Sequence, residues 1–191
     1  MQDKIYCYPD SEVLINRLGI QEEDRLMEVE RRLTMIRLME LLREPIVGGF
    51  NLPHLCSIHR YIFQDLYDWA GEIRQVNIAK GINFCLCDYI ATSAEKIFSD
   101  LRKENFLRSL PFAAFVNRMS YYFAEINALH PFREGNGRAQ REFARTLALY
   151  NGYQLKFSLI PPEEMIRASI DSIVCDYRRT EDMFRRCLRK N

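Results

Sequence analysis

Apolar residues recur every three or four positions along most of this chain, the spacing that places side chains on one face of an α-helix. The clearest run predicts a central core helix over residues 112–129, where steps of three and four alternate at Phe112, Phe115, Met119, Tyr122, Ile126 and Leu129. The same spacing predicts further helices over residues 24–44, 51–71, 88–103, 138–152, 161–174 and 180–189. The chain is therefore predicted to be mainly α-helical.

Two segments need separate treatment. A short helix is predicted over residues 11–20, with Ser11 as its N-cap and Gly19 at its end. Residues 73–86 instead predict a small β-hairpin around a Lys80-Gly81 turn. The β-forming residues on its two sides are Ile73, Val76, Ile78, Ile82 and Phe84.

Composition narrows the class of protein. A length of 191 residues fits a single domain over residues 1–191, which can bury a core without disulfides or a metal. A net charge of +1 argues against a nucleic-acid or membrane partner. The start MQDKIYCYPD lacks a signal-like apolar run, and the six cysteines include no C-x-x-C pair. We expect a cytoplasmic protein with reduced cysteines and no structural zinc.

The stretch HPFREGNGR, residues 130–138, falls where the central helix should end, because Pro131 disfavours helix continuation. A Gly-Asn-Gly loop follows, and another helix should begin near Arg138. Loop N–H groups and a helix N-terminus together form an anion site. Gly135 and Gly137 permit positive φ and leave no Cβ in the way of a ligand.

Charged side chains in the same stretch indicate phosphate chemistry. Arg138 and Arg141 are three positions apart, so both guanidinium groups can reach one phosphate-bearing ligand. Glu134 beside phosphates would hold a divalent cation, usually Mg²⁺. His130 can accept a hydroxyl proton near neutral pH. Together these residues predict transfer of a phosphate-containing group to a hydroxyl.

Each of these features has a plainer reading when it is taken alone. His130 could cap a helix, Glu134 could be solvated, Gly-Asn-Gly could be a turn, and the arginines could be a surface pair. Their conjunction at this spacing favours a site. It is not a Walker loop, because G-x-x-x-x-G-K-[ST] is absent. The other histidines, His54 and His59, lie in an apolar helix and are interpreted as packed or surface groups.

The segment HPFREGNGRAQR resembles the Fic-domain signature H-P-F-x-[D/E]-G-N-G-R-x-x-R, with every fixed position filled over residues 130–141. The segments YCYPDSEVLINRLGI, IHRYIFQDLYDWAGEIRQVNI and KGINF resemble other parts of the same family. The resemblance implies the Fic fold, a compact helical core with a β-hairpin flap next to the active site. It also implies protein adenylylation, in which AMP passes from ATP to a protein hydroxyl.

The resemblance also assigns roles to the residues of the signature. His130 would deprotonate the target hydroxyl, and Glu134 would place Mg²⁺ on the α- and β-phosphates. Arg138 would bind the β-phosphate region and Arg141 the γ-phosphate. Phe132 would anchor the loop in the core. The loop amides, with the Asn136 side chain also near phosphate, would form an anion hole at Gly135, Asn136 and Gly137.

The predicted hairpin would be the family's flap, which pairs with an extended target segment. The alternative is a hairpin with no part in target binding. Family flaps often continue with Ala-Pro after the phenylalanine, whereas this chain reads FCLCDYI, so the target preference stays open. The clamp would consist of Lys80, Gly81, Ile82, Asn83 and Phe84.

Regulation is predicted from an absent motif. In this family an inhibitory helix carries [S/T]-x-x-x-E-[G/N], and its glutamate pairs with the second signature arginine, here Arg141. No serine or threonine of this chain has a glutamate four positions later, and the nearest case is Ser172 with Asp176. We therefore expect a toxin inhibited by a separate small antitoxin. By analogy, the first expected target is the ATPase subunit of a type II topoisomerase.

Two other functions stay open at this stage. The first is a catalytically silent nucleotide-binding helical module, which the intact His130, Glu134 and Arg141 disfavour. The second is transfer of UMP, phosphate or phosphocholine, as in some relatives. Gly137 argues against the kinase-like branch, which has lysine at that position.

Overall fold

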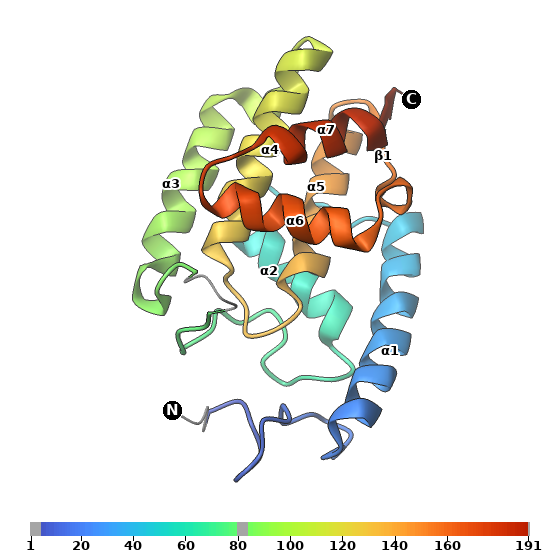
Figure 1. The fold of residues 1–191 in the computed structure, drawn as a ribbon, viewed down its shortest axis with the longest axis vertical. Coiled ribbons are helices and arrows are strands. Elements are labelled where there is room, and N and C mark those ends of the chain that lie inside the picture. The colour runs from blue at the N-terminus through green and yellow to red at the C-terminus, as the bar shows by residue number, and fades with distance from the viewer. Residues whose placement is uncertain (1–4, 80–83, 191) are drawn as a thin grey trace.

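The computed structural model describes residues 5–79 and 84–190, and the fold there is mainly α-helical, as predicted (Figure 1). The α-helices are α1 (Glu23–Arg43), α2 (Leu52–Phe63), α3 (Ile90–Lys103), α4 (Phe112–Leu129), α5 (Asn136–Tyr150), α6 (Pro162–Ile173) and α7 (Arg178–Cys187). Short 3-10 turns cover Cys87–Tyr89, Asn105–Leu107 and Phe157–Leu159. The strands β1 (Tyr153–Leu155) and β2 (Leu188–Lys190) form an antiparallel pair.

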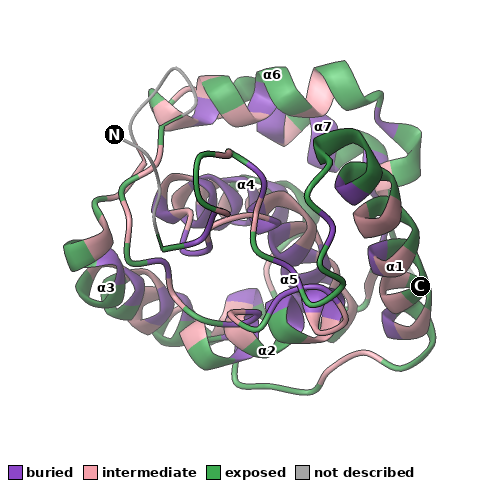
Figure 2. Ribbon diagram, turned by 90° about the horizontal axis from the view of Figure 1, so that it is seen from below, coloured by how far each residue is buried: buried purple, intermediate pink, exposed green. Residues whose placement is uncertain are grey.

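Helix α4 is the centre of the molecule, which confirms the prediction from its apolar spacing. It packs against α3, α5, α6 and α7, while α1 packs on α2, and α2 on α5. Figure 2 shows buried residues gathered on α4 and α5 and on the inward faces of the surrounding helices. Because α4 and α5 are both buried, the loop that joins them is held by the core on both sides.

The boundaries of α2 differ from the prediction. The helix was expected to continue to Gly71, but it ends at Phe63. Leu66 and Tyr67 follow in a turn whose N–H groups both donate to the Phe63 carbonyl, and both side chains are buried. Gly71 itself has a φ of +84°. The apolar stripe therefore reports burial correctly, although the last part of it is not helical.

The helix predicted over residues 11–20 is wrong. This segment is irregular, with an isolated antiparallel bridge between Cys7 and Leu14. The buried Asn16 side chain accepts from Ile20 N–H at 3.0 Å and donates to the carbonyls of Leu14 and Ile20 at 2.9 and 2.7 Å. A short polar side chain that satisfies the backbone in this way competes with helix formation.

The predicted hairpin over residues 73–86 is only partly covered, because Lys80, Gly81, Ile82 and Asn83 lie outside the described residues. The described strand pair lies elsewhere and joins the segment after α5 to the segment after α7, with Leu155 opposite Leu188. The helix expected over 180–189 therefore stops at Cys187. No helix within residues 5–79 and 84–190 has both the length and the apolar character needed to cross a bilayer.

Candidate active site

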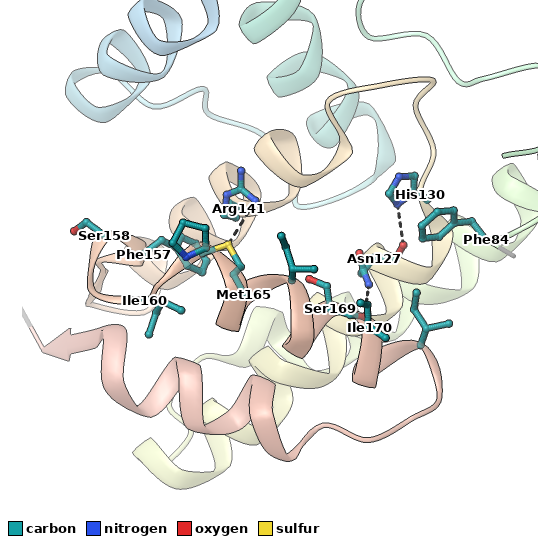
Figure 3. Close-up of a pocket in the computed structure, with 13 residues that line it drawn as sticks. Phe84, Asn127, His130, Arg141, Phe157, Ser158, Ile160, Met165, Ser169 and Ile170 are labelled. Atoms are coloured by element: carbon teal, nitrogen blue, oxygen red, sulfur yellow. Dashed lines mark hydrogen bonds between the residues drawn. The ribbon is translucent and has the colours of Figure 1, made fainter. Parts of the chain in front are cut away.

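His130 ends α4 in a left-handed conformation, with φ 45° and ψ 60°. Its Nδ1 lies 3.3 Å from the Asn127 carbonyl (Figure 3). Because a carbonyl oxygen can only accept a hydrogen bond, this contact places the proton on Nδ1 and leaves the lone pair on Nε2. The Phe84 ring stacks on the imidazole, with centroids 3.7 Å apart and planes 15° apart. The ring of His130 is therefore oriented with Nε2 as its basic nitrogen.

The loop after His130 is closed by its own side chains. The Asn136 side chain accepts from the Phe132 N–H at 2.8 Å and donates to the Phe132 carbonyl at 2.7 Å. Phe132 is fully buried, and its ring stacks on His59 with centroids 3.9 Å apart. These contacts agree with an anchoring role for Phe132. They also show that the described bonds of the Asn136 side chain go to the loop itself, so its place near phosphate stays a prediction.

Gly135 has a steric reason to be glycine, whereas a Cβ on Gly137 would only crowd the movable end of the Arg141 side chain. Gly135 has a φ of +78°, and a Cβ there would lie 2.1 Å from Cζ of Phe63. A Cβ on Gly137 would lie 3.0 Å from Nη1 of Arg141. Helix α5 begins at Asn136, so the first N–H groups of this helix lack intrahelical partners. The start of α5 therefore lies beside Arg141 with N–H groups available to a ligand, and anion binding there stays a prediction.

Arg138 is held by residues that the sequence analysis did not identify. Its Nη2 donates to Oε1 of Glu30 at 2.5 Å, and its Nη1 donates to Oγ1 of Thr34 at 3.2 Å, both from α1. The guanidinium also lies over the Phe63 ring, 4.6 Å from its centroid. Glu134 Oε1 is 3.8 Å from Nη2. The Arg138 side chain is thus preset in one position at the mouth of the loop.

A second layer supports Glu30. The hydroxyl of Tyr67 donates to Oε2 of Glu30, and burial together with the Glu30 charge raises the pKa of Tyr67. The Tyr67 ring in turn stacks on Trp69, with centroids 4.3 Å apart. Glu30 and Thr34 are polar residues one turn apart on α1, and Thr34 is buried. Nothing in their sequence pattern signals this role, because polar residues on a helix are ordinarily solvated.

Arg141 has different surroundings. Its Nη1 lies 3.6 Å from Sδ of Met165, and it forms no ion pair with a carboxylate in the part of the chain that the structure describes. Burial, followed by the nearby charge of Arg138, lowers the pKa of Arg141. A desolvated cation without a counter-ion is costly unless an anion binds to it. Arg141 is therefore suited to bind an anionic ligand.

A cavity of about 810 Å³ connects His130 with Arg141 (Figure 3). This volume lies in the range of small-molecule and cofactor sites. Polar groups on its wall include Asn127, Ser158 and Ser169. Most of the wall is apolar and comes from α6 and the segment before it: Phe157, Ile160, Pro162, Met165, Ile166, Ile170 and Ile173. The spacing of residues 161–174 predicted a helix but gave no sign that this helix covers the site.

Glu134 suits a cation whose other coordination positions are filled by the bound ligand and water rather than by further protein side chains. Its side chain is 33% exposed, and its Oε1 accepts from the Gly135 N–H at 2.8 Å. No group of three or more His, Cys, Asp or Glu that could hold a metal occurs among the described residues. Mg²⁺ commonly binds through one carboxylate, substrate phosphates and water. A single carboxylate beside an anion loop matches that pattern.

His54 and His59 are both buried, which confirms the packed alternative for them. His59 also contacts the signature loop, which was not predicted. Its Nδ1 accepts from the Gly71 N–H at 2.8 Å, so its Nε2 donates to the Glu134 carbonyl at 2.9 Å. Burial lowers the pKa of His59 to about 4. A neutral imidazole therefore braces the loop from α2.

The described structure thus brings together His130, Glu134, Arg138 and Arg141 around one loop, with the cavity beside it. It also places Phe84 on His130, as the only residue of the predicted clamp within the described ranges.

Comparisons with known proteins show which family this chain resembles. Residues 49–148 match the Fic/DOC family. The probable protein adenylyltransferase Fic of Salmonella typhimurium is 39% identical over 184 residues, which cover 96% of this chain and 91% of that protein. The protein adenylyltransferase VbhT of Bartonella schoenbuchensis is 41% identical over 187 residues, which cover 97% of this chain and 38% of VbhT.

Solved structures extend the comparison. BepC of Bartonella tribocorum, with bound AMPPNP, has a TM-score of 0.92 at 25% identity, and the match covers 97% of each chain. An N-terminal Fic domain from Bartonella quintana, with bound ADP, has a TM-score of 0.92 at 28% identity, covering 97% of this chain and 95% of that one. This chain belongs to the Fic/DOC family.

Proposed function

We propose that this protein is a protein adenylyltransferase, which transfers AMP from ATP to a hydroxyl side chain of another protein. The observation that carries the proposal is the cavity that joins the basic nitrogen of His130 to the guanidinium of Arg141, which forms no ion pair with a carboxylate among the described residues. A base and a cation at opposite ends of a nucleotide-sized cavity suit transfer between a phosphate ester and a hydroxyl. The adenylyltransferase names of the curated relatives support the same choice.

In the proposed complex, the nucleoside of ATP occupies the apolar part of the cavity along α6. The phosphates lie on the N-terminus of α5, against the amides of Asn136 and Gly137, while the Gly135 N–H keeps its bond to the Glu134 carboxylate. Arg138 then binds the β-phosphate region, and Arg141 binds the γ-phosphate. The distances and burial around Arg138 suit a fixed contact, whereas Arg141 gains its first counter-ion when the nucleotide binds.

In the transfer step, His130 receives the proton of the target hydroxyl and pyrophosphate is the leaving group. The target hydroxyl oxygen attacks the α-phosphorus of ATP, and its proton passes to Nε2 of His130. The bond from the α-phosphorus to the oxygen that bridges it to the β-phosphorus breaks, and pyrophosphate leaves. The loop amides and the arginines stabilise the charge that develops on the phosphate oxygens.

Glu134 is the residue of this site that would hold Mg²⁺, which when bound supplies a positive charge on the α- and β-phosphates. The hydrogen bond from the Gly135 N–H already orients the Glu134 carboxylate beside the loop. Transfer should therefore stop when a chelator removes divalent cations and should return with Mg²⁺ or Mn²⁺.

The decisive experiment incubates the protein with a bacterial lysate and ATP labelled at the α-phosphate. A labelled target band is expected, and ATP labelled at the γ-phosphate should label nothing. His130→Ala should reduce transfer by ~10²–10⁴-fold while ATP still binds, because the base is not a phosphate ligand. Binding of ATP without any labelled band would favour the silent binding module. A band from γ-labelled ATP alone would indicate phosphate transfer instead.

We further propose that a separate small antitoxin with [S/T]-x-x-x-E-[G/N] restrains this activity by pairing its glutamate with Arg141. The nearest internal substitute is Asp176, and its carboxylate is bound to Arg178 at 2.6 Å. A groove of about 340 Å³ beside α1 also reaches Arg141, and Leu38 and Leu42 line it. The antitoxin helix would lie in that groove.

Expression of the chain alone in bacteria tests this regulation. We expect growth arrest that disappears with His130→Ala and with the co-expressed antitoxin. The ATPase subunit of a type II topoisomerase is the first target to examine in the arrested cells, and the segment from Lys80 to Phe84 is the proposed target clamp. Normal growth with soluble, active protein would contradict the antitoxin proposal without affecting the transferase assignment.

A further inference from the structure

Arg74 has one of the most buried large side chains of the molecule, with 2% of its surface exposed. All of its described side-chain bonds go to backbone carbonyls. Its Nε donates to the His130 carbonyl at 2.8 Å and its Nη1 to the Val76 carbonyl at 2.7 Å. Its Nη2 donates to the Cys85 carbonyl. One guanidinium therefore joins three separate backbone segments.

The backbone around Arg74 reinforces the same junction. The Arg74 N–H donates to the Pro131 carbonyl at 2.9 Å, and the Cys85 N–H donates to the Ala128 carbonyl at 3.0 Å. One bond ends on the loop directly after His130 and the other on the last turn of α4. Residues 74–76 and residue 85 are thus fastened to the last turn of α4 and the residues directly after it.

Burying a cation in this way needs a specific reason. Arg74 forms no ion pair with a carboxylate within residues 5–79 and 84–190, and burial lowers its pKa. A buried charge without a counter-ion is destabilising unless hydrogen bonds compensate for its lost hydration. Only a planar guanidinium offers donors in three directions at fixed angles, and a lysine ammonium cannot span the same carbonyls. The geometry requires arginine in particular.

The bonds of Arg74 act on His130 from two sides. The backbone of His130 has a left-handed φ of 45°. A residue other than glycine keeps this conformation only when its surroundings hold it. The bond from Arg74 Nε holds that backbone through the carbonyl oxygen. The bond from Arg74 Nη2 to the Cys85 carbonyl fixes the backbone next to Phe84, and the Phe84 ring stacks on the imidazole of His130.

We propose that Arg74 is a positioning residue for His130, which sets the backbone and, through Phe84, the ring plane of the catalytic base. The proposal rests on the transferase function proposed above. Arg74 does not line the cavity. Its loss should therefore lower the rate of transfer and leave ATP binding almost unchanged. A misplacement of the base by about 1 Å can cost ~10²-fold in rate.

The test compares Arg74→Lys and Arg74→Met with wild type, and Arg118→Lys is the control. Arg118 is a partly buried arginine on α4 that binds Glu104, away from the cavity. We expect kcat for AMP transfer to fall by ~10²-fold in both Arg74 variants, with KM for ATP changed by less than about threefold. The Arg118 variant should keep the wild-type kcat. Arg74→Met keeps a long side chain without burying a charge, so it serves if the lysine variant does not fold.

Amide hydrogen exchange gives a readout that does not depend on activity. In the Arg74 variants, exchange should accelerate at residues 84–86 and 128–130 and stay unchanged in α7. Wild-type rates in both assays would overturn the proposal, and so would a raised KM for ATP at unchanged kcat. If neither variant folds, Arg74 is a folding residue and the proposal fails. If wild-type protein modifies no target, the transferase proposal fails, while the exchange result still decides whether Arg74 holds the His130 loop.

Discussion

At the scale of single residues, the two signature arginines have opposite surroundings. Arg138 is paired with Glu30, whose side chain is 14% exposed, whereas Arg141 faces the cavity without an acid in the described part of the chain. The first contributes to the folded state before any ligand arrives. The second is held in an unfavourable state that a ligand relieves.

This contrast predicts different effects for one substitution at two positions. Arg141→Met should leave the thermal midpoint no lower than wild type, because it removes a half-buried charge that has no carboxylate partner in the described part of the chain. Its affinity for ATP should fall by about 10–100-fold, since a charge-assisted hydrogen bond contributes roughly 1.5–3 kcal/mol. Arg138→Met should instead lower the free energy of unfolding by about 1–3 kcal/mol, because Glu30 loses its cation. Calorimetry and nucleotide titration measure both, and a lower midpoint for Arg141→Met than for Arg138→Met would contradict this account.

His54 predicts a dependence of stability on pH. Burial lowers the pKa of His54 from its ordinary value of 6.5, and the ring lies between Phe50 and Phe143. The folded state therefore binds fewer protons than the unfolded chain, and the free energy of unfolding should decrease as pH falls below about 6.5. Denaturant unfolding between pH 5 and 8 measures this slope. His54→Phe should reduce it, while His59, whose shift has the same sign, keeps it from vanishing. An unchanged slope in His54→Phe would exclude the assignment.

At the scale of elements, the junction of α4 and α5 could be predicted from the sequence because its signals are local. Alternating apolar steps ended at His130, Pro131 stopped the helix, and the glycines marked the turn. The partners of this junction could not be predicted. Arg138 meets Glu30 across 108 positions and Arg74 meets His130 across 56. Such contacts depend on how α1 and the segment after α2 pack against the junction. The spacing of apolar residues within one helix does not predict that packing.

The same limit explains the errors. Residues 64–71 keep a helical stripe although the chain has already turned, because burial alone produces that pattern. Residues 11–20 do not form the predicted helix, because the Asn16 side chain bonds to the N–H and carbonyl groups of Ile20 in place of helical backbone partners. In both segments the backbone conformation depends on hydrogen bonds that the spacing of apolar residues does not predict.

Gly135 offers a matched test of the loop. Gly135 and Gly152 have nearly equal φ values, +78° and +79°, but only a Cβ at Gly135 meets another group, Phe63 at 2.1 Å. Gly152→Ala should cost about 1–2 kcal/mol of unfolding free energy from backbone strain alone. Gly135→Ala should cost more and also abolish nucleotide binding. Equal destabilisation of the two variants would show that the Phe63 contact is unimportant.

At the scale of the whole molecule, α4 contacts four other helices, α3, α5, α6 and α7. Because four helices share one core around α4, parts of it should not unfold independently. We propose that residues 1–191 form one domain. Thermal unfolding should therefore be a single transition, with the same midpoint by calorimetry and by far-ultraviolet circular dichroism. Two separated transitions would contradict the single domain.

The stack of Trp69 on Tyr67 has a practical consequence. Trp69 is the only tryptophan of the chain, and two chains of contacts lead from it to the loop of residues 130–138. One passes through Tyr67 and Glu30 to Arg138, and the other through the His59 ring to the Glu134 carbonyl. Indole emission depends on the polarity and order of its surroundings. The protein thus contains an intrinsic fluorescent reporter, whose signal should change when a nucleotide reaches the loop, without any added dye.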